Sequence, residues 1–316
     1  MKIAQITDIH LGGTPEFCMA EWPGRPTLAS LSLVLDDIQR TVPDLDALVV
    51  TGDIADLGLD DPGGYMTLRS ELEPRGGLLQ RSFIIPGNHD RRAPLLEAWP
   101  ECRSDPQADR SASADPDVSF YASVPSADGE EWRLVGLDSG GRSFLLPEET
   151  PSGPTLAPSQ LQGLADELSD AQHEGKRTLL FMHHAPVAVG HYFDSPFAES
   201  VREPLESMLR ESGRVEAIFT GHVHYACQGE LAGLPIYASP STCCQYTTNP
   251  ADGEWMVASS ASDHTHPAGI DPQAPTRGHA LVPPGYRIIE ADGDGAVETR
   301  CVWVAEAAEV GASASL

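Results

Sequence analysis

The sequence predicts an α/β fold, and two observations lead to this prediction. Apolar runs of strand length alternate in the first half of the chain with segments of helical periodicity. Residues of metal-binding types directly follow five of the apolar runs. Ligand sites of open α/β sheets lie at the carboxyl ends of the strands. We therefore expect layers of sheet and helix, with a functional site at one edge of the sheet.

The elements of the first half follow in a regular order. A first strand is expected over Lys2–Thr7. A helix should come next, with Thr27 as its N-cap and apolar residues at helical spacing: Leu28, Leu31, Leu35 and Ile38. Strands over Ala47–Thr51 and Ser82–Pro86 then enclose a short helix around Tyr65–Leu72. This alternation is typical of a layered α/β fold.

The second half continues the pattern less regularly. Residues 93–116 and 139–158 are expected to be loop-like, because Pro, Gly and polar residues dominate them. Helices are expected around Leu161–Leu168 and Phe197–Arg210. The remaining strands are expected over Val118–Ala122, Trp132–Asp138, Thr178–Met182, Val215–Thr220, Tyr225–Glu230, Leu234–Ala238, Tyr286–Glu290 and Val297–Val304.

We expect residues 1–316 to form a single domain. The residues of metal-binding types run from Asp8 to His224 and must converge, so no domain boundary can fall between them. The segment 250–284 holds several prolines and no sustained periodicity. We interpret residues 240–285 as a C-terminal elaboration that acts as a lid or in oligomerisation. Its histidines, which are expected to lie in the lid or on the surface, are His264, His266 and His279.

The composition argues against several classes of partner. The formal net charge is −27, and such a surface repels nucleic acid and anionic membranes at long range. No basic start precedes an apolar stretch of about 7–15 residues, as in a signal peptide. No apolar run approaches the roughly 18 residues of a membrane span. We therefore expect a cytoplasmic protein that binds neither nucleic acid nor membranes, with a homodimer or larger homo-oligomer left open.

The cysteines are expected to be free thiols, because none forms a C-x-x-C pair and the compartment is expected to be reducing. They are Cys18, Cys102, Cys227, Cys243, Cys244 and Cys301. The adjacent pair Cys243-Cys244 leaves a redox role open.

Seven residues of metal-ligand type lie in five motifs, each behind a predicted strand. The motifs are Asp8-x-His10, Gly52-Asp53, Gly87-Asn88-His89-Asp90, His183-His184 and Gly221-His222-x-His224. Oxygen donors mixed with imidazoles suit borderline divalent cations such as zinc, manganese or iron(II). Asp8 and His10 stand two apart, and alternate side chains of an extended segment share a face, so both can reach one ion. Two ions roughly 3.5–4 Å apart can clamp a phosphoryl group.

The five motifs, in this order, resemble those of the calcineurin-like metallophosphoesterase family over about residues 1–240. The resemblance implies a β-sandwich flanked by helices, with a dinuclear metal site at the strand ends. It also implies two divalent ions (manganese, iron, zinc or cobalt) and hydrolysis of a phosphoester by a metal-bound hydroxide. The implied ligands are Asp8, His10 and His224 for the first metal and Asn88, His183 and His222 for the second, with Asp53 bridging both.

Further residues of the motifs are expected to support the reaction. The resemblance implies that His89, like Asp53, is a catalytic residue, which contacts a phosphoryl oxygen or protonates the leaving group. The alternative is that His89 only orients the metal ligands. Asp90 is expected to hold the loop or an imidazole. His184 should point to the opposite side from His183 if the strand continues to that position, and its expected role is to support the metal ligands.

Three residues outside the ligand set are candidates for substrate contact or for added positive charge. His191 lies eight residues beyond His183, in a loop expected to overhang the metals, where it binds substrate or is a surface histidine. Arg91 and Arg92 directly follow the Asn-His-Asp motif. They either add positive charge to the site or are solvated residues at the start of a helix.

Two segments resemble a subgroup of the family, the bacterial cyclic-nucleotide phosphodiesterases and their glycerophosphodiesterase relatives. They are Met182–Pro186 and Pro240–Gln245. We therefore expect hydrolysis of 3′,5′-cyclic nucleotides or similar small phosphodiesters. The alternatives are a glycerophosphodiesterase or phosphomonoesterase on the same site, and a non-catalytic scaffold of this fold. The scaffold is disfavoured because none of the seven ligands is missing, and a nuclease is disfavoured by the negative charge.

Overall fold

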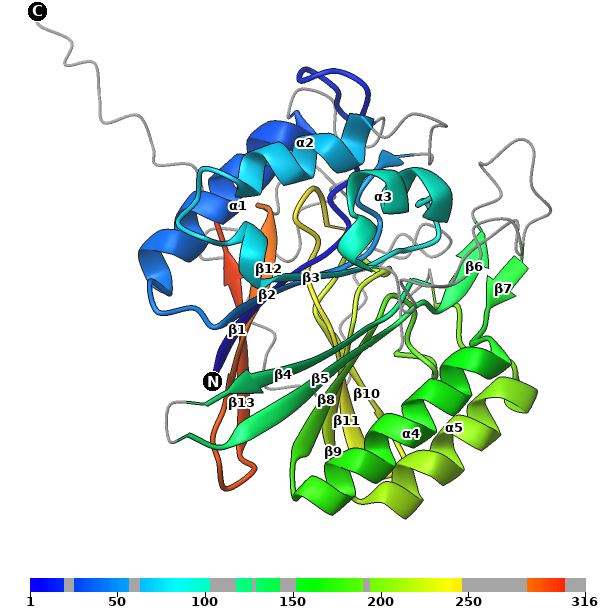
Figure 1. The fold of residues 1–316 in the computed structure, drawn as a ribbon. Helices are drawn as coiled ribbons and strands as arrows, with labels where there is room; N and C mark the ends of the chain where they lie inside the picture. Colours follow the sequence, from blue (N-terminus) through cyan, green and yellow to red (C-terminus); the bar gives the residue numbers. More distant parts are fainter. Residues whose placement is uncertain are drawn as a thin grey trace, which may run out of the picture.

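Two β-sheets pack face to face, and helices cover the outer face of each (Figure 1). The computed structural model describes residues 1–19, 26–56, 63–102, 118–126, 129–142, 152–189, 194–245 and 283–304. This is the predicted α/β fold, a β-sandwich flanked by helices. Among the described helices, none is both long enough and apolar enough to cross a membrane.

The first sheet has five strands in the order β13-β12-β1-β2-β3. Their bounds are β1 Lys2–Ile6, β2 Ala47–Thr51, β3 Ser82–Ile85, β12 Gly285–Ala291 and β13 Val297–Trp303. The strands β1, β2 and β3 are parallel, whereas β12 and β13 pair antiparallel. The three motifs that follow β1, β2 and β3 therefore lie at one edge of this sheet.

The second sheet has six strands in the order β10-β11-β9-β8-β5-β4. Their bounds are β4 Phe120–Pro125, β5 Glu131–Leu137, β8 Arg177–Met182, β9 Val215–Thr220, β10 Cys227–Leu231 and β11 Leu234–Ala238. The strands β5, β8, β9 and β11 are parallel. The motifs that follow β8 and β9 therefore also share an edge. A separate ribbon pairs β6 (Gly140–Arg142) with β7 (Ser152–Pro154).

The helices form the two outer layers. The first sheet is covered by α1 (Thr27–Thr41), α2 (Gly63–Leu72) and α3 (Arg92–Ala98), and the second by α4 (Pro158–Glu174) and α5 (Glu199–Ser212) (Figure 1). Short 3₁₀ turns, η2 (Leu79–Arg81) and η3 (Pro100–Cys102), flank β3 and α3. Of the apolar positions of α1 that repeat at helical spacing, Leu31, Leu35 and Ile38 are buried against the first sheet and Leu28 is half-buried.

The core between the sheets is apolar and rich in phenylalanine. Phe181 of β8 stacks on Phe219 of β9 with ring centroids 5.4 Å apart. Ile3 of β1 and Val49 of β2 belong to the same buried cluster. Removal of this apolar surface from water stabilises the fold, and it also fixes the two sheets, and hence the motif loops, relative to each other.

Some local predictions were wrong. Thr27 is the first residue of α1 rather than its N-cap, which is Pro26. The helix α3 and the ribbon β6–β7 lie in segments predicted to be loop-like. With seven residues, α3 is too short to show periodicity, and its Pro94 sits in the first turn, where no intrahelical N–H is lost. The strand β10 begins at Cys227, two residues later than predicted.

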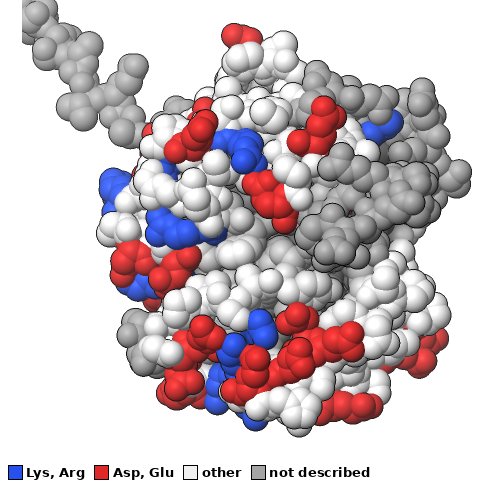
Figure 2. All heavy atoms as spheres, viewed as in Figure 1, with Lys and Arg blue, Asp and Glu red and all other residues white. Residues whose placement is uncertain are grey.

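Acidic and basic side chains are interspersed over the face shown in Figure 2. Arg133 lies within ion-pair distance of Glu167 and Glu174, and Lys176 pairs with Glu131. Ion pairs in contact with solvent contribute little to folding, because water and salt screen them. Their main effect is to offset part of the acidic charge locally.

Candidate metal centre

The loops after β1, β2, β3, β8 and β9 meet at the carboxyl ends of the strands. The Asp8 N–H donates to the Gly52 carbonyl at 2.9 Å, and the Gly221 N–H donates to the His183 carbonyl at 2.9 Å. Backbone hydrogen bonds therefore hold neighbouring motif loops against each other within each sheet.

The loops after β2 and β3 approach so closely that two positions require glycine. A Cβ at Gly52 would overlap the Gly87 backbone, and a Cβ at Gly87 would overlap the Asp53 carboxylate. Gly52 also has a φ of 94°, which side chains disfavour. The glycines that precede Asp53 and Asn88 thus let these two side chains meet.

Five of the seven predicted ligands have a left-handed backbone. They are Asp8 (φ 52°), His10 (51°), Asp53 (50°), His222 (71°) and His224 (51°). Ala232 (58°) is the only other non-glycine residue with positive φ in the described ranges. Such conformations cost about 1–3 kcal/mol each and concentrate at functional sites. The extended geometry predicted for Asp8 and His10 is therefore wrong, since both residues have turned out of the strand.

Asp8, His10 and His224 form one cluster of ligand-type atoms, all within 4.8 Å of one another. His224 Nε2 lies 3.0 Å from His10 Nε2 and 3.3 Å from Asp8 Oδ1. The backbone N–H of His222 donates to Asp8 Oδ2 at 3.1 Å and holds the carboxylate in place. All three side chains are buried.

Asn88, His183 and His222 form a second cluster. Asn88 Oδ1 lies 3.0 Å from His183 Nε2 and 2.9 Å from His222 Nδ1. Asp53 joins the two clusters, because its Oδ2 lies 3.3 Å from His183 Nε2 and 3.8 Å from His10 Nε2. The structure thus brings all seven predicted ligands together.

Hydrogen-bond partners determine which ring nitrogen of each histidine faces the centre. Nδ1 of His183 lies 2.8 Å from the Thr51 carbonyl, and Nδ1 of His224 lies 2.9 Å from the Cys244 carbonyl. A carbonyl oxygen only accepts, so each Nδ1 carries a hydrogen. In the neutral ring, each Nε2 then presents a lone pair to the centre.

His10 has the same arrangement, with Nδ1 3.3 Å from the carboxylate of Asp56. Three imidazole lone pairs therefore converge with the oxygens of Asp8, Asp53 and Asn88. Electron pairs packed in this way repel one another unless positive charge lies between them. The mixed nitrogen and oxygen donors fit divalent cations.

The pKa values of His183, His224 and Asp53 favour positive charge in the clusters, whereas burial and the neighbouring His183 lower the pKa of His222 to about 3. Burial lowers the pKa of His183, but the Asp53 carboxylate outweighs burial and raises this pKa to about 9. Burial also lowers the pKa of His224, but the Asp8 carboxylate outweighs burial and raises this pKa to about 10. Burial raises the pKa of Asp53, but His183 and His89 outweigh it and hold that pKa well below its usual range. In the absence of metal, protons supply the missing charge.

Asp56 is a site residue that the sequence motifs did not identify. Its Oδ1 lies 3.3 Å from His10 Nδ1 and 3.6 Å from His89 Nδ1. The backbone N–H of His89 donates to Asp53 Oδ1 at 2.8 Å. Burial lowers the pKa of His89, but the carboxylates of Asp53 and Asp56 outweigh burial and raise this pKa to about 9. The His89 ring therefore holds a proton at neutral pH. The available signal was the spacing Gly-Asp-x-x-Asp after β2.

Asp90 holds the motif loops together, which is one of the two roles predicted for it. Its carboxylate accepts backbone N–H groups of Ile54 (3.0 Å), Ala55 (3.0 Å) and Gly87 (2.8 Å). It therefore ties the loop after β2 to the loop after β3.

Arg92 does not supply unbalanced positive charge to the site. Its Nε lies 2.9 Å from Asp138 Oδ2, and both side chains are buried. The Asp138 carboxylate neutralises the guanidinium, which also donates to the Gly87 carbonyl at 3.1 Å. Arg91 is the N-cap residue of α3, at the helix start as in the second alternative, but its side chain is half-buried rather than fully solvated.

His184 packs against the predicted ligands instead of pointing to the opposite side of the strand. The strand β8 ends at Met182, so the alternation of a strand no longer applies. The His184 ring lies 4.4 Å from the His222 ring and 4.8 Å from the His183 ring. Ser139 Oγ lies 2.8 Å from His184 Nδ1. This contact between sequence-distant residues had no signal in the motifs.

Four other predicted positions lie outside the described residues. They are His191, His264, His266 and His279. Most of the elaboration predicted over residues 240–285 also lies there, and its role stays a prediction.

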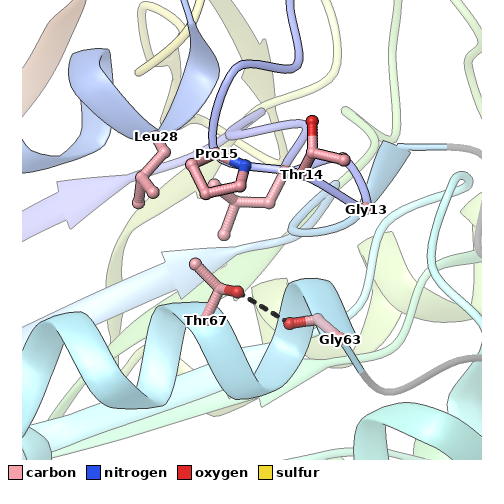
Figure 3. A pocket seen from close by; sticks show the side chains of 8 residues that line it. Gly13, Thr14, Pro15, Leu28, Gly63 and Thr67 are labelled. Atoms are coloured by element: carbon pink, nitrogen blue, oxygen red, sulfur yellow. Dashed lines mark hydrogen bonds between the residues drawn. The ribbon is translucent and has the colours of Figure 1, made fainter.

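A small cavity of about 100 Å³ lies on the helix side of the loop after β1 (Figure 3). It is lined by Leu11 to Pro15 of that loop, by Leu28 of α1, and by Gly63 and Thr67 of α2. None of the seven predicted ligands lines it, so the cavity is separate from the ligand clusters.

A family model described as calcineurin-like phosphoesterase matches residues 1–226, which include all five motifs. The chain belongs to this family. Together with the buried histidine and aspartate clusters, this makes the protein a metallophosphoesterase that uses divalent metal ions.

Several curated relatives of this phosphoesterase are named as cyclic-nucleotide phosphodiesterases. A probable cyclic nucleotide phosphodiesterase of Pseudoalteromonas sp. (strain SM9913) is 30% identical over 79% of this chain and 82% of its own length. The 3′,5′-cyclic adenosine monophosphate phosphodiesterase CpdA of Pseudomonas aeruginosa is 28% identical over 94% and 88%. A cAMP/cGMP dual specificity phosphodiesterase of Mycobacterium tuberculosis is 28% identical over 76% and 67%.

Solved structures share the fold of this phosphoesterase at low sequence identity. A dimetal phosphatase from Danio rerio aligns with a TM-score of 0.52 and 16% identity, over 77% of this chain and 88% of its own. GAP50, the anchor in the inner membrane complex of Plasmodium, aligns with a TM-score of 0.54 and 10% identity, over 96% and 84%. These likenesses concern the fold alone.

Proposed function

We propose that this phosphoesterase hydrolyses small phosphodiesters and that 3′,5′-cyclic nucleotides are among its substrates. The observation that carries the proposal is the convergence of imidazole lone pairs and carboxylates on two clusters joined by Asp53. The relatives named as cyclic nucleotide phosphodiesterases support the substrate class.

The ligand roles follow from the two clusters. We assign the first ion to Asp8, His10 and His224, the second to Asn88, His183 and His222, and a shared position to Asp53. Manganese, iron, zinc and cobalt all suit these donors. When bound, two such ions attract phosphoryl oxygens and lower the pKa of a water molecule toward about 7.

His89 is proposed to act on the ester itself. Its proton is retained at neutral pH because the carboxylates of Asp53 and Asp56 lie beside it. From there the ring can hold a phosphoryl oxygen or protonate the departing alkoxide, a contribution of about 10²–10⁴-fold in rate. Asp53 also accepts the backbone N–H of His89, so the carboxylate that joins the clusters positions this ring as well.

Charge favours diesters over monoesters. A diester carries one negative charge at neutral pH, whereas a monoester carries close to two. Against a net charge of −27, the singly charged ester meets less long-range repulsion. Screening limits this effect to about 8–10 Å at physiological salt, so shape must complete the selection.

The test compares kcat/KM on bis-p-nitrophenyl phosphate, p-nitrophenyl phosphate and cyclic AMP at equal manganese content. We expect faster cleavage of the diester than of the monoester, together with measurable cyclic AMP hydrolysis. Preference for the monoester would establish the phosphomonoesterase alternative. Diester cleavage without cyclic AMP turnover would favour glycerophosphodiesters as substrates. Two bound metals without any hydrolysis would favour the scaffold alternative.

The cellular setting is part of the same proposal. We propose a cytoplasmic protein with small-molecule substrates, and a single domain whose residues 240–285 serve as a lid or in oligomerisation. Size-exclusion chromatography with light scattering tests oligomerisation. A monomer at micromolar concentration would leave only the lid role.

A further inference from the structure

A second group of metal-binding atoms lies on the other side of the His224 ring. Cys244 Sγ lies 3.6 Å from Met19 Sδ and 3.6 Å from His224 Nδ1. Cys243, Cys244 and Met19 are buried and pack together as one cluster. Cys244 therefore packs with two other sulfur-bearing side chains.

The turn that presents the two thiols is held from inside the fold. Ser241 Oγ accepts the backbone N–H groups of Cys243 at 2.9 Å and Cys244 at 3.1 Å. The same hydroxyl donates to the Asp8 carbonyl at 2.8 Å. The two thiols are thus positioned by the fold before any ion arrives.

The sulfur spacing matches that of donors sharing one ion. At the bond length of about 2.3 Å that sulfur has to zinc, the 3.6 Å between Cys244 Sγ and Met19 Sδ corresponds to an angle of about 100° at a shared ion. Thiolate and thioether sulfurs are soft donors, a class that suits Cu(I). The donor chemistry therefore differs from that of the dinuclear centre.

We propose that Met19, Cys243 and Cys244 form a binding site for Cu(I), separate from the dinuclear centre. On binding, each thiol releases its proton to water and forms a sulfur–copper bond, and the thioether of Met19 donates a lone pair. Copper enters and stays as Cu(I), so the step involves no electron transfer. The proposal is independent of the substrate of the phosphoesterase.

The test uses the manganese-loaded protein titrated anaerobically with Cu(I) against a chromogenic Cu(I) chelator. We expect one tightly bound Cu(I) per chain. X-ray absorption should show sulfur neighbours at about 2.3 Å. Both measurements use the unaltered protein, so their results do not depend on whether the variants fold. A copper shell of nitrogen and oxygen neighbours only would overturn the proposal.

Variants then identify which sulfur atoms bind the copper ion. The double variant Cys243→Ser/Cys244→Ser should bind Cu(I) at least tenfold more weakly. Met19→Leu, which keeps a similar volume, should weaken binding by a smaller factor. Cys301→Ser is the matched control, because its thiol is outside the cluster, and it should bind as the unaltered protein does. Circular dichroism and the urea midpoint report whether each variant keeps its fold. Equal copper affinity in the folded double-serine variant would overturn the proposal and leave only a buried cluster of sulfur-bearing side chains.

Discussion

The Ser139 hydroxyl lies 2.8 Å from His184 Nδ1 and accepts the backbone N–H of the same residue at 3.1 Å. The hydroxyl has a hydrogen to donate and a second lone pair with which to accept, so it can bond Nδ1 in either tautomer of the ring. Burial, together with His222, lowers the pKa of His184 well below its usual value, so the ring stays neutral. Ser139 thus holds the ring that packs on His222.

We expect Ser139→Ala to weaken binding of the second metal by about 10–100-fold, the range for residues that orient ligands. The first metal should stay bound, because no ligand of its cluster contacts Ser139. Ser139→Thr keeps the hydroxyl and should restore most of the affinity. Competitive metal titration measures both affinities. Unchanged affinity in Ser139→Ala would mean that packing alone positions His222.

Asp53→Ala should abolish hydrolysis and reduce the bound metal to fewer than two ions per chain. The reason is that Asp53 is the carboxylate in contact with both clusters. Elemental analysis after desalting measures the metal content. Asp44→Ala, at an exposed aspartate paired with Lys2, is the matched control and should keep both ions. Two retained ions in Asp53→Ala would remove Asp53 from its bridging role.

His89→Ala should keep both metals and lose turnover by about 10²–10⁴-fold, the usual contribution of a general acid. Asp56→Asn should lose less, because the Asp53 carboxylate still lies beside the His89 ring. Steady-state kinetics and metal content are measured on the same samples. Loss of metal from His89→Ala would make His89 a ligand and contradict the assignment.

Metal uptake should release protons at neutral pH. In the metal-free protein, the pKa values of His183 and His224 are about 9 and about 10. Both rings are therefore protonated and must lose those protons before they bind metal. Calorimetry in buffers of different ionisation enthalpy counts the released protons. Zero release at about pH 7.5, well above the ordinary histidine pKa of about 6.5, would contradict this account.

The same shifts predict how pH affects the metal-free fold. A histidine whose pKa is raised in the folded protein stabilises the fold, and this stabilisation is fully present below about pH 6.5, the pKa of histidine in the unfolded chain. That contribution is lost as pH rises through about 9 to about 10. The free energy of unfolding of the chelated protein should therefore fall between about pH 7 and pH 10. Urea denaturation at each pH measures it, and the metal-loaded protein is the control.

Breaking the buried pair of Arg92 and Asp138 should destabilise the fold by about 3–5 kcal/mol, because one charge is left buried alone. Urea denaturation of Arg92→Met and Asp138→Leu measures the loss. The double variant removes both charges and should recover much of the stability. A double variant no more stable than the single ones would mean that other contacts of Arg92 dominate, such as its bond to the Gly87 carbonyl.

The fold class could be predicted from the sequence because the strands and helices leave periodic patterns of apolar residues, and because the ligands lie in short local motifs. The ends of β1 and β2 carry Asp8 and Asp53, whose types and positions pointed to a metal site before any contact was known. Short elements escaped prediction because α3 and the ribbon β6–β7 span too few residues to show a period.

The supporting contacts of the site could not be predicted in the same way. The partners of His183 and His224 are main-chain carbonyls of Thr51 and Cys244, and a carbonyl is present at every residue. Ser139 reaches His184 across 45 residues of sequence. Such contacts depend on how the two sheets pack, and the side-chain types alone carry no sign of them.

The left-handed backbone at five predicted ligands has a consequence for the evolution of this protein. At those positions glycine is the residue that the local conformation prefers, and it would relieve strain of about 1–3 kcal/mol per site. Replacing His224 by glycine would relieve this local strain, but it would also remove a metal donor and the contact with Asp8 that stabilises the metal-free fold. At these five positions the requirement for a metal donor, rather than the local backbone preference, therefore determines the residue type.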